Sequence, residues 1–375
     1  MSTRLNATLV AGLVLATGLF TTACQKDEAT TSSSGSGTTS TSGGTANPDP
    51  ATVSTCASAT GIAKVVCLAD AFKAQLDGTQ LTTLQRTYST TEAKKWSNLP
   101  QGLVGSSNKR VGLSFGAMTT TQIQYAKALL KEVAGTTANE GWDELQQLLN
   151  ADEYLNANGG GSTYGAANYY LAFLGTPAAT GTFEIQFGGH HLAFANTYKD
   201  GVLTGATPSF RGVEPYSTFT WNGTSNQPLQ QEAAAFAAML TGLSSTEQAT
   251  ARQSATYSDL VLGPQQDGNF PATPVGLKCS SLSSVEKALV LAAMKPYVYD
   301  TDDADAATLL ATYASELDNT YLAYSGTTAM TTRNDYVRLD GPHVWIEYSC
   351  QGGIVLSGTH PHSVWRDKSK DYGGN

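Results

Sequence analysis

The spacing of apolar residues changes near Phe183, and this change limits the fold of the 375-residue chain more than any other feature. From Phe183 to Phe187, apolar residues alternate with Glu184 and Gln186, which is the period of a β-strand. Before this point the apolar residues recur at helical spacing. The predicted helices of the first half are 62–76, 79–88, 119–134 and 142–155.

Helical and strand patterns alternate after this change of period. Lys199-Asp200-Gly201 is typical of a hairpin turn, and short apolar runs at 337–339, 344–348 and 354–356 predict closing strands. Further helices are predicted at 230–243, 246–254, 283–294 and 304–322. This order predicts an α+β fold, with N-terminal helices followed by a mostly antiparallel sheet with interleaved helices.

The N-terminus has the pattern of an export signal. Arg4 precedes an apolar run from Ala7 to Phe20, which is too short to span a bilayer. The run ends at Thr21-Thr22-Ala23-Cys24, which resembles a bacterial lipobox. We therefore predict a signal peptide over residues 1–23 and a lipid on Cys24, with simple cleavage after Ala23 and full secretion as the alternative.

A polar tether follows the predicted lipid attachment site. Residues 24–50 are rich in Ser, Thr and Gly, and such a composition predicts a flexible linker. No repeat and no second linker follow, so residues 51–375 are expected to form one domain. The predicted location is the bacterial cell envelope, where the lipid would hold the protein to a membrane.

Four cysteines remain besides Cys24, an even number that suits disulfides in an oxidising compartment. Four cysteines allow three pairings. We favour Cys56–Cys67, a short local loop, and Cys279–Cys350, a long-range link. No C-x-x-C occurs, which argues against a metal–thiolate site.

The charge of the chain argues against a nucleic-acid partner. The formal net charge is -9, the sequence pI is near 5.0, and only 14% of residues are charged. The densest basic pairs, Lys94-Lys95 and Lys109-Arg110, are too sparse to follow a phosphate backbone. The small-molecule or polymer ligand stays undetermined.

The five histidines are concentrated in three short segments, and the first 189 residues contain none. We expect these segments to converge on one metal site, with zinc or copper as the ion. His190 and His191 would point to opposite faces of a regular strand, so a bulge is expected at Gly188-Gly189. His190 is expected to face the site because it follows the glycines directly.

His360 and His362 form the second pair, separated by Pro361. In an extended segment both imidazoles lie on one face roughly 6–7 Å apart, a spacing that suits two ligands of one metal. Because proline cannot donate to a strand ladder, this segment is expected to be an edge or exit strand.

Several polar residues follow this pair within ten positions, among them Arg366, Asp367, Asp371 and Tyr372. We assign Arg366 and Asp367 to catalytic roles, and Asp371 and Tyr372 to hydrogen bonds that orient the imidazoles. The alternative is that these residues cap the chain end through salt bridges.

The third segment holds the fifth histidine, His343, which shares a predicted strand face with Trp345 and Glu347. Glu347 could act as a general base or as a metal ligand. Its alternative role is to pair with Arg338 or Arg366.

Three functions remain open from these patterns. The first is an exported metal-dependent hydrolase in which Glu347 activates water. The second is a non-catalytic surface lipoprotein that binds a metal or another ligand, and the third is a copper-dependent oxidative enzyme. The helical zinc motif H-E-x-x-H and the serine motif G-x-S-x-G are both absent from the sequence.

Several motifs resemble the domain-of-unknown-function family 3500, whose members include many exported proteins. The likeness covers roughly Ala63 to Gly373, and its most specific elements are Gly-His-His-Leu and the His-x-His that precedes Asp-Tyr-Gly. The family name includes no activity, so the resemblance implies signature segments but no function. The motifs are "KKWSNLP", "GGHHLAFANTY", "TPSFRGVEP", "GPHVWIEYSCQ" and "HPHSVWRDKSKDYGG".

Overall fold

The computed structural model describes residues 47–374, all of which belong to one compact unit spanning Thr45–Asn375. The predicted signal peptide, Cys24 and most of the tether lie outside the described residues. The predicted α+β class is confirmed, because nine α-helices accompany a twelve-stranded sheet within the described part of the chain.

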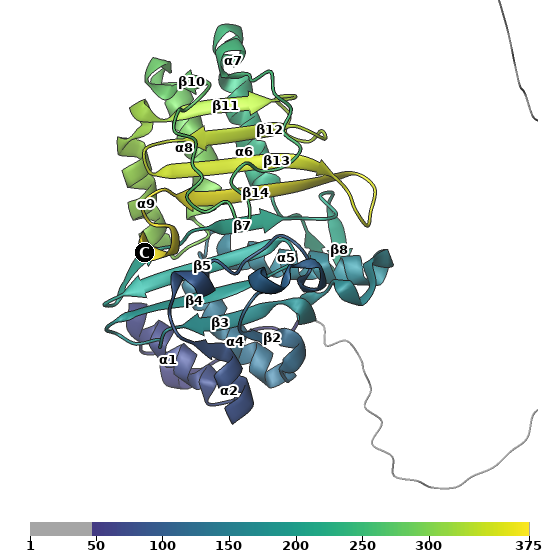
Figure 1. The fold of residues 1–375 in the computed structure, drawn as a ribbon, viewed down its shortest axis with the longest axis vertical. Helices are drawn as coiled ribbons and strands as arrows, with labels where there is room; N and C mark the ends of the chain where they lie inside the picture. Colours follow the sequence, from purple (N-terminus) through teal and green to yellow (C-terminus); the bar gives the residue numbers. More distant parts are fainter. Residues whose placement is uncertain (1–46, 375) are drawn as a thin grey trace, which may run out of the picture. The chain divides into compact units, whose positions relative to one another are not determined.

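The sheet is mostly antiparallel, and its strands run in the order β1-β3-β4-β5-β7-β14-β13-β12-β11-β10 (Figure 1). β2 pairs with β3, β6 pairs with β5, and only the β1–β3 pair is parallel. The strands are β1 Gln85–Arg86, β2 Leu113–Ser114, β3 Tyr170–Leu174, β4 Thr182–Gly189, β5 Leu192–Lys199, β6 Val202–Gly205, β7 Ser209–Gly212, β10 Leu277–Lys278, β11 Tyr321–Ser325, β12 Tyr336–Asp340, β13 Val344–Gly352 and β14 Thr359–Asp367. A separate small hairpin consists of β8 Phe219–Trp221 and β9 Thr224–Asn226.

Local sequence signals define several helix starts. Asp77, Thr119, Ser244 and Ser283 each begin a helix with a capping box, in which the N-cap side chain and the N3 side chain exchange hydrogen bonds with the backbone. The helices are α1 Gly61–Lys73, α2 Gly78–Leu84, α3 Thr90–Ala93, α4 Thr120–Val133, α5 Gly141–Leu155, α6 Gln230–Gly242, α7 Ser245–Ala251, α8 Ser284–Val298 and α9 Asp303–Ser315.

The prediction of a helix to Leu322 is wrong at its C-terminal end. α9 ends at Ser315, and Tyr321–Ser325 forms β11, which pairs with β12 along its whole length. The predicted strand at 354–356 is also wrong. Those residues form a bend whose three backbone N–H groups all donate to Oε1 of Glu214. These donors therefore do not pair with a neighbouring strand.

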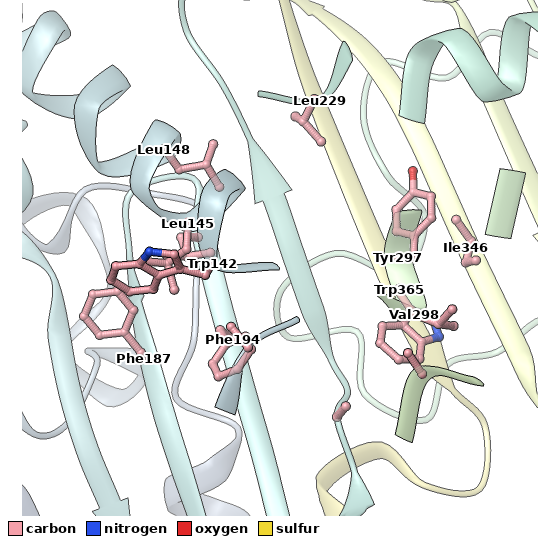
Figure 2. Close-up of a cluster of buried hydrophobic side chains, with 14 of the residues drawn as sticks. Trp142, Leu145, Leu148, Phe187, Phe194, Leu229, Tyr297, Val298, Ile346 and Trp365 are labelled. Carbon is pink, nitrogen blue, oxygen red and sulfur yellow. The ribbon is translucent and has the colours of Figure 1, made fainter. Parts of the chain in front are cut away.

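The two faces of the sheet are covered differently. On one face, α5 and α8 pack against apolar strand residues, as Figure 2 shows for Trp142 and Leu145 near Phe187 and Phe194. On the other face, a smaller apolar cluster lies under irregular segments around residues 94–112 and 257–270. We call these the helix-covered face and the loop-covered face.

β14 lies inside the sheet, which corrects the expectation of an edge strand. It pairs with β13 on one side and with β7 on the other. The carbonyl of Pro361 accepts a hydrogen bond from the backbone N–H of Val213, the residue after β7. The C=O and N–H of one strand residue point to the same side, so the N–H that proline lacks would also have pointed toward β7. The β7 ladder begins at His362, one residue later, so the proline removes no ladder hydrogen bond on this side.

One of the two predicted disulfides is present and the other is not. The Cys56–Cys67 disulfide is confirmed, with a Cα–Cα distance of 5.7 Å. The Cys279–Cys350 disulfide is wrong, because both cysteines are buried free thiols. Cys279 follows β10 and Cys350 lies on β13, so two strands separate them. Three strand spacings amount to about 14 Å, whereas bridged Cα atoms lie within about 7 Å.

No helix in the segment 47–374 combines the length and the apolar character that are needed to cross a membrane.

Candidate metal centre

A tight hairpin turn positions the first histidine pair. β4 ends at Gly189 and β5 begins at Leu192, so His190 and His191 are the two residues of the turn. His191 has a φ of +63°, a left-handed conformation that is uncommon for residues other than glycine. The expected bulge is therefore absent, and the turn directs His191 toward the other histidines while His190 stacks against it at a ring distance of 3.6 Å.

The glycines around this turn allow close packing. A Cβ on Gly189 would lie 2.5 Å from the ring of Tyr169. Gly212 on β7 pairs with His362, and a Cβ there would lie 2.9 Å from Cδ2 of His191 and 3.0 Å from Cδ2 of His362. The two imidazoles therefore occupy the space that a side chain at position 212 would need.

Three imidazole nitrogens meet at one point on the loop-covered face. Nε2 of His360 lies 2.6 Å from Nε2 of His191 and 3.0 Å from Nε2 of His362. Both residues of the His-Pro-His pair share one strand face, as predicted. Nitrogens on a tetrahedral zinc ion lie about 3.3 Å apart, so a small outward shift of the rings would fit an ion among them. The three histidines could therefore hold a metal ion.

Burial keeps two of these imidazoles, those of His191 and His360, neutral. Desolvation, with the neighbouring histidines adding to it, lowers the pKa of His191 well below its usual value. The same causes lower the pKa of His360 to about 2. Neutral imidazoles keep the nitrogen lone pair that a metal requires.

Carboxylates lie behind the imidazoles. Nδ1 of His362 lies 2.9 Å from Oδ1 of Asp259, and Nδ1 of His360 lies 4.0 Å from Oε2 of Glu214. Burial alone would raise the pKa of Asp259, but the hydrogen bond with His362 brings it below its usual value. A proton on Nδ1 of His362 leaves Nε2 free as a ligand atom, which is the arrangement common behind metal-binding histidines.

His190 is held by a carboxylate of its own. Its Nδ1 lies 2.6 Å from Oδ1 of Asp152, and the second oxygen of Asp152 accepts from the backbone of Gly165 at 2.8 Å. The hydroxyl of Tyr169 donates to the carbonyl of His190. These contacts fix the ring of His190 beside the cluster, although its nitrogens do not join the three that converge.

The histidines line one wall of a cavity of about 390 Å³. Apolar residues and one arginine make up much of the remaining wall, including Leu99, Pro100, Leu103, Tyr164, Arg333 and Ile354. Arg110, which is buried, donates to the carbonyls of Ser97, Leu99 and Gly189 and so ties this wall to the hairpin turn. Burial lowers the pKa of Arg110 to about 10, which leaves it charged at neutral pH.

Glu347 does not line this cavity. Its carboxylate is fully buried and accepts four hydrogen bonds, from the backbone of Val261 and Leu262 and from the side chains of Tyr336 and Trp345. Burial nevertheless raises its pKa. Glu347 thus attaches the loop-covered face to the segment above it, and no lone pair faces the histidines.

The remaining predicted residues lie elsewhere. His343 precedes β13 at the end of the strand away from the cluster, and its Nδ1 pairs with Glu316. Arg366 bonds to Asp267 and Asp371 and lines, with Tyr372, a second cavity of about 300 Å³.

Asp367 points to the helix-covered face, where it accepts from Tyr313 at 3.1 Å. These placements match the capping alternative for Arg366 and Asp371, whose salt bridge joins the chain end to β14.

Sequence reasoning missed Asp152, Glu214, Asp259 and Arg110. Each lies more than 20 residues from the nearest histidine along the chain, and although Glu214 belongs to the motif "TPSFRGVEP", nothing in the sequence links that motif to the histidines. They come to the cluster from four places that only the tertiary fold brings together: α5, the segment before β2, the bend after β7 and the segment before β10.

The fold and the cluster define an α+β protein with a candidate three-histidine metal site beside an open cavity. The chain belongs to the family described as Protein of unknown function (DUF3500), which matches residues 58–374. No curated protein and no solved structure matches the chain.

Proposed function

We propose that His191, His360 and His362 bind a divalent transition metal ion, zinc in the first place, and that the protein is a metal-dependent hydrolase. The convergence of three Nε2 atoms on the wall of a cavity of about 390 Å³ supports this proposal. Three protein ligands with an open fourth position are the usual arrangement of catalytic zinc, whereas structural zinc has four protein ligands. A zinc ion there would lower the pKa of a bound water molecule and polarise a substrate carbonyl or phosphoryl group.

His190 is the proposed proton carrier beside the ion. Its Nδ1 is engaged by Asp152, and its Nε2 has no hydrogen-bond partner within residues 47–374. The residue lines the cavity, so Nε2 can exchange a proton with a water molecule or a leaving group there. This role replaces the one first assigned to Glu347.

The metal proposal is tested by elemental analysis of purified wild-type, His191→Ala and His343→Ala proteins. His343 is the matched control, because it is a histidine paired with a carboxylate outside the cluster. We expect about one zinc per wild-type chain, a loss of affinity of more than about 100-fold in His191→Ala, and wild-type binding in His343→Ala. Equal metal content in all three proteins would overturn the site, and copper in place of zinc would favour oxidative chemistry.

The hydrolase proposal needs its own measurement. Zinc-loaded protein would be assayed on carboxylic-ester, amide and phosphate-ester substrates, with His190→Gln and His191→Ala as variants. We expect His190→Gln to keep the metal and to lose about 100-fold in turnover, the size of a typical general-base contribution. Metal binding without turnover on any substrate would support the non-catalytic alternative instead.

We also propose that the protein is exported and held to a membrane by a lipid on Cys24. The Cys56–Cys67 disulfide supports an oxidising compartment, and the N-terminal sequence supports the signal and the lipid. Fractionation of cells that express wild-type or Cys24→Ser protein tests this. Wild-type protein should sediment with membranes, and the variant should not; equal distribution would contradict lipidation.

A further inference from the structure

Four acidic side chains meet inside the helix-covered face. Glu140 immediately precedes α5 and Glu144 lies within it, Glu232 comes from α6, and Asp300 follows α8. Arg211 of β7 lies among them. All five residues are buried, so this charged cluster lies inside the apolar core.

Glu144 and Asp300 have a partner on each carboxylate oxygen, although each oxygen keeps a second lone pair. Glu144 accepts from Nε of Arg211 at 3.2 Å and from the backbone of Leu229 at 3.1 Å. Asp300 lies 2.9 Å from Nη2 of Arg211 and accepts from the backbone of Gly141 at 3.0 Å. The guanidinium is therefore paired with these two carboxylates.

The other two carboxylates each have an oxygen without a partner. Oε2 of Glu140 and Oε2 of Glu232 accept no hydrogen bond from residues 47–374, although the residues are only 5% and 1% exposed. Both side chains point into the cluster, because one oxygen each of Glu140, Glu144 and Glu232 lies within 4.8 Å of the others. An unpaired buried carboxylate is strongly unfavourable, so the cluster is incomplete as four acids and one guanidinium.

We propose that Glu140, Glu144 and Glu232 bind a hard divalent cation of the calcium class. All available donors are oxygens, which suit calcium, magnesium or manganese and not the softer ions that imidazoles select. Calcium–oxygen distances of 2.3–2.6 Å allow ligand oxygens to lie up to about 5 Å apart, and the three glutamate oxygens lie within 4.8 Å of one another. A divalent charge would offset most of the excess of four carboxylates over one guanidinium.

The competing explanation is that protons fill the site. Burial, with Glu144 and Asp300 adding to it, raises the pKa of Glu140 to about 10 in the absence of a cation. Burial also raises the pKa of Glu144 to about 7. The charge of Lys295 favours the ionised form of Glu140. Its ammonium group lies over the ring of Tyr299, 5.0 Å from the ring centre. The two explanations differ in one measurable respect, which is whether stability depends on divalent cations.

The test is calorimetric and thermal titration of chelator-treated, full-length protein with Ca²⁺, Mg²⁺ and Mn²⁺ at pH 7.5. The variants are Glu232→Gln, His191→Ala and Glu184→Gln. Glu184 is the matched control, because it is a fully buried carboxylate outside the cluster that accepts hydrogen bonds from Thr197 and Gln186. A cation at a hundredfold excess over its Kd should raise the wild-type unfolding midpoint by about 5 °C.

We expect one bound cation per wild-type chain, at least a tenfold loss of affinity in Glu232→Gln, and unchanged binding in His191→Ala and Glu184→Gln. If Glu232→Gln does not fold, Glu140→Gln replaces it. The proposal is overturned if no cation binds the wild-type protein or shifts its unfolding midpoint. It is also overturned if a folded Glu232→Gln or Glu140→Gln variant binds the cation as tightly as wild type.

Discussion

Neighbouring residues of β7 contact two different polar clusters, the histidine cluster and the carboxylate cluster. Gly212 packs against His191 and His362 on the loop-covered face, and Arg211 pairs with Glu144 and Asp300 on the helix-covered face. Successive residues of a strand point to opposite faces, so one step along the chain separates the two clusters. The clusters differ in charge and in access to solvent.

The difference follows from what covers each face. Irregular segments leave a cavity of about 390 Å³ beside the histidines, where a substrate can reach them. Packed helices enclose the carboxylates, so every charge there must be paired, protonated or bound to an ion. We therefore expect changes in the carboxylate cluster to alter stability, and changes in the histidine cluster to alter zinc binding.

The largest effect is expected from Arg211→Met. Removing the guanidinium leaves Glu144 and Asp300 buried without their charged partner, which should lower the free energy of unfolding by about 3–5 kcal/mol. Urea unfolding measures this change. The double variant Arg211→Met/Glu144→Gln should lose less than the single variant, since it removes one of the two stranded charges. A loss below about 1 kcal/mol in the single variant would show that Arg211 does not neutralise the cluster.

A somewhat smaller effect is expected from Glu184→Gln, which tests a single buried carboxylate under the loop-covered face. Burial raises the pKa of Glu184 from 4.5 to about 7 in the folded protein. The native state therefore holds this proton more tightly than the unfolded state, and stability is lost as pH rises through about 7. Relative to wild type, the glutamine variant should gain about 2–3 kcal/mol between pH 4.5 and 8.

Urea unfolding across that pH range supplies the measurement. A pH-independent difference between Glu184→Gln and wild type would show that Glu184 has an ordinary pKa. Thr197→Val is a useful companion, because it removes the hydroxyl that donates to Glu184 and should raise the carboxyl pKa further.

The smallest effect is expected from Asp259→Asn, which removes the charge behind His362. We expect about a tenfold loss of zinc affinity, at the lower end of the range for such hydrogen-bond partners. Stability should change by less than about 0.5 kcal/mol, because the side chain is 49% exposed. Asp152→Asn is the control, since Asp152 contacts His190 and not one of the three converging histidines, and it should bind zinc as wild type does. Equal losses in the two variants would contradict the assignment of His362 as a ligand.

Much of the fold was predictable from local patterns. Helical spacing located the long helices of the first half, and alternation from Phe183 located β4. The helix predicted to Leu322 was too long, and the predicted strand at 354–356 is a bend. In both places a tertiary contact decides which backbone hydrogen bonds form. Residues 321–325 pair with β12, and the N–H groups of 354–356 donate to Glu214.

The sequence by itself determined that histidines would form the notable cluster, because they are few and paired, and because His360 and His362 share one strand face at any register. It also favoured the Cys56–Cys67 link, which closes a short local loop and is present in the structure. Only the tertiary structure decided that His191 joins the cluster in place of His190, that Glu347 is enclosed by four donors, and that Cys279 and Cys350 remain two strands apart. The physical reason is the same in each case: spacing along a strand fixes the face of a side chain, whereas its neighbours depend on the order of strands and the segments that cover them.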